Sequence, residues 1–191
     1  MAEMAEAELA ALVHGQSAEM LTQLANEYSQ GGPGLSRDPA VAARLWSAAA
    51  AEGSADAAYS YAMSLCTGAG HEEPDMATAA GLLGGLVEHE GHAQAQFNLG
   101  TMFYRGLGVE EDHTRAFTLF EAAAAQQVAP AYFNLGNMYA SGEGLPEGEA
   151  KSDARAMVWY RDAATRGDPM AHLTLGSWYC SGRGAEGVEV S

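Results

Sequence analysis

The chain has 191 residues, 48% of them hydrophobic, with 25 acidic against nine basic residues and a formal net charge of -16 at pH 7. This length can bury a substantial apolar core, and the strong negative charge argues against direct binding to the phosphate backbone of a nucleic acid. No stretch approaches the roughly eighteen consecutive apolar residues of a transmembrane helix, so we expect a soluble protein.

Residues 1–15, MAEMAEAELAALVHG, are predicted to form a short amphipathic helix that caps the chain. They include three glutamates and no lysine or arginine, which is unlike a secretory signal or a basic transit peptide. The only two cysteines, Cys66 and Cys180, lie far apart, so a disulfide-stapled secreted fold is disfavoured. We therefore expect the protein in a reducing compartment, most simply the cytoplasm.

One pattern recurs from residue 18 to residue 184. Residues 97–108 are FNLGTMFYRGLG, residues 133–144 are FNLGNMYASGEG, and looser copies start at Thr22, Tyr59 and Leu173. The copies begin 36 to 40 residues apart, a period typical of helical repeat arrays. We predict four repeats at 18–54, 55–92, 93–128 and 129–168, a partial fifth repeat at 169–184, and a flexible tail at 185–191.

Each copy predicts a first helix that ends at glycines such as Gly106 and Gly108, which adopt left-handed backbone at little cost. A second helix then starts at a side chain that can cap free backbone N–H groups, namely Asp38, Asp75, Asp112 or Ser152. Glycines also end these second helices, except that Gln127 takes the matching place in the third repeat. Small residues recur in register on the first helices, at Ala25, Ala62, Gly100, Gly136 and Gly176.

These small residues indicate that neighbouring helices approach closely. A helix pair buries only one face by itself, so repeated pairs build a continuous core by stacking. We therefore predict an all-α array of helix pairs, with a last helix near 169–180 that covers the end of the array. In the second repeat, Gly84 and Gly85 weaken the second helix by about 1 kcal/mol each relative to alanine.

The pattern of a small-residue first helix, a G-x-G turn and D-x-x-x-A-x-x followed by aromatic residues resembles the Sel-one-like repeat, a relative of the tetratricopeptide repeat. LGTMFYRGLGVEEDHTRAFTLFEAAAAQ, from residue 99, is the clearest line, and the resemblance covers residues 18–184. It implies a right-handed alpha-alpha superhelix, or solenoid, of four to five helix-turn-helix repeats with capping helices. It also implies an adaptor or assembly scaffold, with no catalysis and no cofactor.

In the geometry that this resemblance implies, the first helices line a concave groove. Aromatic and methionine side chains among short polar groups suit the capture of a protein or peptide. Tyr59, Phe97 and Phe133 are equally well explained as core residues, and position alone does not decide between the two. The predicted groove residues are Asn26, Ser29, Tyr59, Met63, Phe97, Thr101, Tyr104, Phe133, Asn137, Leu173 and Ser177.

Acidic residues gather in the turns within the helix pairs. In a solenoid such turns share one edge, so they predict a negative ridge for a basic segment of a partner, or else a face that only keeps the chain soluble. The residues are Glu72, Glu73, Asp75, Glu110, Glu111, Asp112, Glu143, Glu147, Glu149 and Asp153.

Candidates for chemistry are weak. GRGAEG at 182–187 follows a predicted helix instead of a strand, so it is not a dinucleotide-binding loop. Glu88, His89, Glu90 and His92 form the densest cluster of possible metal ligands, but they contain no H-E-x-x-H and are better explained as a polar turn. We expect no metal site, and Cys66 and Cys180 are better explained as small side chains at the rim of the core than as reactive thiols.

The leading hypothesis is a non-catalytic scaffold that binds a protein or peptide in its groove, as a soluble adaptor or as a fixed subunit of an assembly. The alternative is an enzyme, such as a hydrolase with an unrecognised pocket. An enclosed pocket with convergent polar groups would favour the enzyme, and an open groove the scaffold. The sequence does not indicate the oligomeric state.

Overall fold

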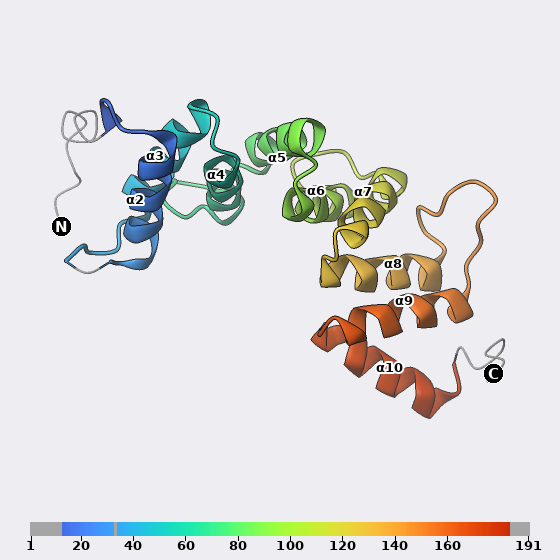
Figure 1. Ribbon diagram of the computed structural model, residues 1–191. Helices are drawn as coiled ribbons and strands as arrows, with labels where there is room; N and C mark the ends of the chain where they lie inside the picture. The colour runs from blue at the N-terminus through green and yellow to red at the C-terminus, as the bar shows by residue number, and fades with distance from the viewer. Residues whose placement is uncertain (1–12, 33, 184–191) are drawn as a thin grey trace. The chain divides into compact units, whose positions relative to one another are not determined.

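The computed structural model describes residues 13–32 and 34–183, and over these residues it contains α-helices and no strand (Figure 1). Almost all of the predicted N-terminal capping helix and the whole predicted tail lie outside the described residues. The helices are α2 (Ala18–Gln30), α3 (Pro39–Ala51), α4 (Ala55–Thr67), α5 (Met76–Glu90), α6 (Ala93–Arg105), α7 (His113–Ala125), α8 (Ala129–Ser141), α9 (Asp153–Thr165) and α10 (Pro169–Ser181).

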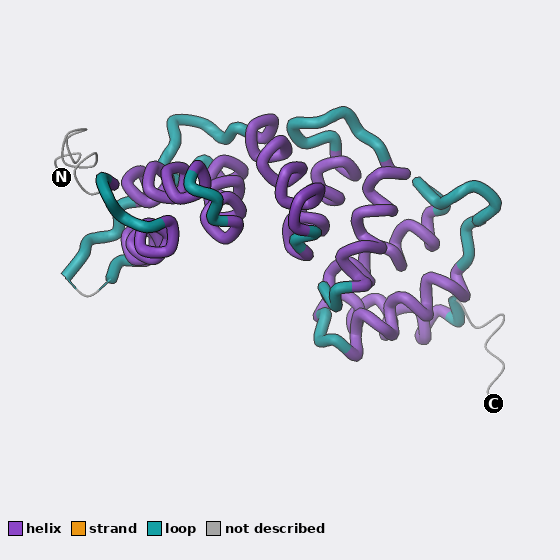
Figure 2. Tube along the Cα trace, turned by 45° about the horizontal axis from the view of Figure 1, so that its top comes forward, coloured by secondary structure: helices purple, strands orange, loops and turns teal. Residues whose placement is uncertain are grey.

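The chain forms two compact units, Met1–Glu90 and Gly91–Ser191. In the first unit α2 packs against α3, α3 against α4, and α4 against α5. In the second unit each helix from α6 to α10 likewise packs against the next one along the chain. Figure 2 shows these neighbouring helices joined by loops. The most extensive contacts between helices within each unit therefore join helices that follow one another in the sequence, as the repeat predicts.

The predicted start signals of the second helices are confirmed. Asp38 caps α3, Asp112 caps α7 and Ser152 caps α9, each by accepting a hydrogen bond from a backbone N–H in the first turn. Asp75 accepts from the backbone N–H of Thr78 at 3.0 Å and from its hydroxyl at 2.6 Å. These side chains satisfy donors that the helix itself leaves unpaired.

Gln127 has a φ of 65°, the one positive φ among the described residues other than glycine. The second helices of the other repeats place Gly53, Gly91 and Gly167 at this position, all with positive φ. Left-handed backbone is costly for a side chain with a Cβ atom. The Gln127 carboxamide oxygen accepts a hydrogen bond from Arg166 Nε at 3.0 Å, which ties the end of α7 to the end of α9.

The core of the second unit depends on two glycines. A Cβ atom on Gly100 would lie 2.9 Å from Phe120 Cε1, and one on Gly136 would lie 2.6 Å from Tyr160 Cδ1. Phe120 and Tyr160 are 1% and 2% exposed, so neither ring has free space to move into. In each complete repeat of this unit the ring of the second helix therefore lies directly on the backbone of the first helix.

We expect Gly136→Ala to destabilise the second unit by about 1–2 kcal/mol, because the overpacking against Tyr160 exceeds the gain in helix propensity. Gly176→Ala is the matched control, since no atom lies within 4 Å of its added Cβ, and it should stabilise α10 by up to about 1 kcal/mol. Urea unfolding of both variants measures the difference. Equal stabilities would contradict the close packing of the ring on Gly136.

Gly84→Ala in α5 should raise the free energy of unfolding by up to about 1 kcal/mol. Its added Cβ meets no atom within 4 Å and its φ is not positive, so the gain in helix propensity is not offset by a clash. Thermal unfolding followed by circular dichroism measures it. A lower melting temperature would show that this position requires glycine.

Candidate protein-binding surface

Each unit has its own first-helix surface, which we define as the solvent-accessible side chains of α2 and α4 in the first unit and of α6, α8 and α10 in the second unit. All the groove residues that the sequence predicts lie on these helices. Asn26 and Ser29 are on α2, Tyr59 and Met63 on α4, Phe97, Thr101 and Tyr104 on α6, Phe133 and Asn137 on α8, and Leu173 and Ser177 on α10.

In the first unit, polar contacts hold part of this surface in place. The exposed Asn26 accepts a hydrogen bond from Trp46 Nε1 at 3.0 Å, which links α2 to α3. The half-buried Ser29 donates to the carbonyl of Asn26, and the Ser29 carbonyl accepts from Arg37 Nε. Tyr59 and Met63 are half-buried on α4.

Phe97 and Phe133 belong both to the core and to the surface. Both side chains are half-buried and pack against the core of the second unit. The Phe97 ring lies 6.0 Å from Phe120 and the Phe133 ring 5.5 Å from Tyr160, between ring centroids. Truncating either ring would therefore disturb the core, so these residues are poor probes of binding.

Tyr104 and Asn137 are polar members of this surface that are held by neighbouring elements. Tyr104 stacks on His113, with ring centroids 4.7 Å apart, and its hydroxyl donates to Glu143 Oε2 at 3.1 Å. Burial, and then the bond to Glu143, raises the pKa of Tyr104. The Tyr160 hydroxyl donates to Asn137 Oδ1 at 2.8 Å, and burial raises the pKa of Tyr160 to about 12. Both phenols are therefore neutral hydrogen-bond donors at physiological pH.

Several acids of the predicted ridge are already engaged. Asp153 accepts from Arg183 at 2.7 and 3.1 Å, Glu149 pairs with Arg155, and Asp112 pairs with Arg115 at 3.4 Å. Glu143 holds Tyr104, as described above. These contacts reduce the negative charge that the turns of the second unit offer to a partner.

The weak chemical candidates have structural roles or none. His92 caps α6, with its Nδ1 accepting from the backbone N–H of Ala95 at 3.2 Å. Among the described residues no group of three or more His, Cys, Asp or Glu side chains could hold a metal ion. Cys66 and Cys180 are free thiols, and burial raises the pKa of Cys66. Gly182 ends α10, and the rest of GRGAEG lies outside the described residues.

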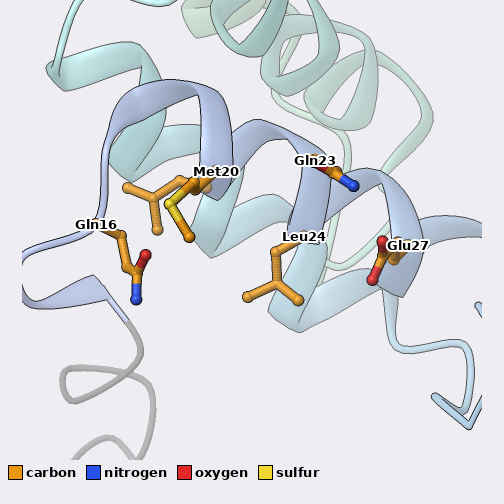
Figure 3. A pocket seen from close by; sticks show the side chains of 6 residues that line it. Gln16, Met20, Gln23, Leu24 and Glu27 are labelled. Atoms are coloured by element: carbon orange, nitrogen blue, oxygen red, sulfur yellow. The ribbon is translucent and has the colours of Figure 1, made fainter.

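A hollow on the outer face of α2 was not predicted. Figure 3 shows Met20 and Leu24 beside it, with Gln16 and Glu27 toward its two ends, and Leu21 and Gln23 complete the lining. Met20 is 58% exposed although it is apolar. The apolar residues Met20 and Leu24, one helical turn apart, are the signal in the sequence that identifies this face.

Three features define a helical repeat protein: paired helices, capped second helices, and aromatic rings packed directly on a glycine of the first helix. The Sel1 repeat pattern matches residues 18–54, 55–83, 93–128 and 129–168, about three quarters of the chain. The chain therefore belongs to the Sel1 repeat family, and the predicted all-α repeat fold is confirmed. Repeats of this family generally serve as protein–protein interaction modules.

Solved structures share this fold. A Sel1 repeat protein from Oxalobacter formigenes superposes with a TM-score of 0.80 at 24% identity, covering 95% of this chain and 67% of that one. A protective antigen of uropathogenic Escherichia coli strains, which displays an SLR fold, has a TM-score of 0.80 at 27% identity. This match covers 95% of our chain but only 38% of the antigen. An immunity protein from Pseudomonas aeruginosa has a TM-score of 0.52 at 20% identity, and the match covers 86% of this chain and 58% of the immunity protein.

No curated protein gave a significant match to the sequence. Within residues 13–32 and 34–183, no helix is long and apolar enough to cross a membrane.

Asp153→Asn should lower the melting temperature at pH 7, because Arg183 holds the pKa of the Asp153 carboxyl below its usual range. A depressed pKa in the folded state means that the stabilisation is present above the usual aspartate value, near 3.9, and is lost as the pH falls through the folded value. The pair is at the surface, so we expect about 0.2–1 kcal/mol.

The measurement is thermal unfolding of the wild type and Asp153→Asn between pH 7 and pH 2. The difference should shrink below about pH 4. Glu147→Gln, at an exposed residue of the loop that precedes α9, removes one charge and is the control. A difference that stays constant with pH would exclude the ion pair as its cause.

Proposed function

We propose that this protein is a non-catalytic scaffold that binds a protein or peptide through its first-helix surface, either as an adaptor or as a subunit of a larger assembly. Membership of a family of interaction modules supports the general class. One observation supports the particular surface: the half-exposed Tyr104 and Asn137 are held in place by Glu143 and Tyr160. Aromatic and amide groups fixed before binding lose little conformational freedom in a complex.

This surface has the composition of a protein interface. Aromatic side chains are enriched at interface cores, and short polar groups around them supply hydrogen bonds. On α6 and α8 the rings of Phe97 and Phe133 lie beside Thr101 and Asn137, each one turn along the same helix. No arrangement of the described residues favours the hydrolase that the sequence left open.

We further propose that the partner contributes a basic segment. The formal net charge of -16 would speed association with a positively charged segment. This electrostatic attraction becomes weaker as the salt concentration rises. Because several acids of the second unit are paired internally, the exposed Glu110 and Glu147 are the better candidates for this contact.

Thr101→Arg tests the first-helix surface without removing a core side chain. The Thr101 hydroxyl donates only within its own helix, to the Phe97 carbonyl at 3.0 Å. The more exposed Thr118 on α7 makes the same kind of bond to Thr114 at 3.1 Å, but on a second helix, so Thr118→Arg is the control. We expect that at least one protein captured by the wild type and by Thr118→Arg is lost with Thr101→Arg.

Affinity capture from the source organism, followed by mass spectrometry, makes this comparison, after circular dichroism has shown that both variants are folded. Repeating the capture at higher salt should weaken recovery of the same protein if its contact is basic. The same set of proteins recovered by all three baits would refute the first-helix surface as the binding site.

A further inference from the structure

The exposed face of α10 differs from that of the other first helices in the second unit. Met170, Leu173 and Tyr179 are 53%, 69% and 58% exposed, and they are three of the five large hydrophobic residues that are exposed in the described part of the chain. Gly176 lies between them along the helix, and nothing comes within 4 Å of where its Cβ would be. In the described residues α10 packs against α9, and no helix follows it.

The two complete repeats of this unit show what covers the equivalent face. Leu173 corresponds to Phe97 and Phe133, and Gly176 corresponds to Gly100 and Gly136. In both repeats the second helix places an aromatic ring, Phe120 or Tyr160, directly on that glycine. No described residue covers this surface of α10, and its shape therefore suits an aromatic side chain from a helix.

The same comparison specifies a second group on the covering helix. Tyr179 corresponds to Phe103 and Tyr139. The guanidinium of Arg115 lies 5.4 Å from the centre of the Phe103 ring, and that of Arg155 lies 5.6 Å from the Tyr139 ring. These distances suit a cation–π contact. Each arginine lies five residues before the aromatic residue that covers the glycine, Phe120 or Tyr160.

We propose that α10 binds an amphipathic helix of a partner protein, which presents an arginine and, five residues later, an aromatic side chain. The aromatic ring lies on Gly176 beside Leu173, and the arginine lies over Tyr179. An arginine-bearing helix complements the net charge of -16 of the whole chain. The Tyr179 hydroxyl already accepts a hydrogen bond from Arg161 Nε at 3.1 Å, so the partner arginine meets the ring of Tyr179 and not its hydroxyl. The site lies on α10, the last helix among the described residues, so it can be tested independently of the α6 position at Thr101.

The chain supplies a probe for this site. Residues 152–167, SDARAMVWYRDAATRG, contain α9 with Arg155 and Tyr160, and a labelled peptide of this sequence is a surrogate for the partner helix. The matched control peptide has Arg155→Ala and Tyr160→Ala. Fluorescence anisotropy with the full chain measures binding, and amide chemical-shift changes identify the helix that the peptide contacts.

We expect saturable binding of the α9 peptide, with shifts centred on α10, and a loss of at least about tenfold in affinity with the control peptide. Gly176→Leu fills the space for the ring and should weaken binding by at least about tenfold, with its helix content unchanged or higher. Leu173→Asp, at a side chain that is 69% exposed, should weaken binding too and provides a second variant. Gly81→Leu, at an exposed glycine of α5 with open space around it, should leave binding unchanged.

Three results would overturn the proposal. The first is no saturable binding by the wild type up to about 1 mM peptide. A Kd of about 1 mM corresponds to a binding free energy of roughly 4 kcal/mol. The second is equal binding by Gly176→Leu and Leu173→Asp, which would place the peptide elsewhere. The third is a dimeric wild type and a monomeric Gly176→Leu in light scattering, which would assign this face to a second copy of the chain.

Discussion

The close approach of each aromatic ring to the backbone of the preceding helix is the constraint on which the second unit depends. It requires glycine at positions 100 and 136, because a Cβ there would lie 2.9 and 2.6 Å from atoms of Phe120 and Tyr160. With the ring held on the backbone, the two helices of a repeat pack with few voids, as interiors require. The ring in turn orients a surface group, since Tyr160 donates to Asn137.

This packing divides the first helices between the core and the surface. Leu99 and Leu135 are buried, whereas Tyr104 and Asn137 remain accessible on the same helices. Because the most extensive contacts join neighbouring helices of a unit, the surface of each repeat is supported mainly by the helices next to it in the sequence. A substitution at one exposed position is therefore expected to have little effect on distant packing.

Much of the fold was predictable because its determinants are local. Asp38, Asp112 and Ser152 start helices through bonds to their own first turn, and Gly106 and Gly142 end helices through their own left-handed backbone. The candidate surface was predictable only as a set of first-helix positions. The bond between Tyr104 and Glu143 spans 39 residues, and the pairing of Arg183 with Asp153 spans 30, so no local pattern indicates either of them.

The sequence by itself determined the class of fold, the period and the family of this protein, because helix caps, glycine turns and apolar spacing act within a few residues. Tertiary structure alone decided which equivalent residues are buried. Phe133 and Leu173 occupy the same place in their repeats, yet one ring packs on Tyr160 and the other side chain is 69% exposed. The reason is that a side chain is buried only where a neighbouring helix covers it, and two residues at the same place in their repeats can differ in this cover.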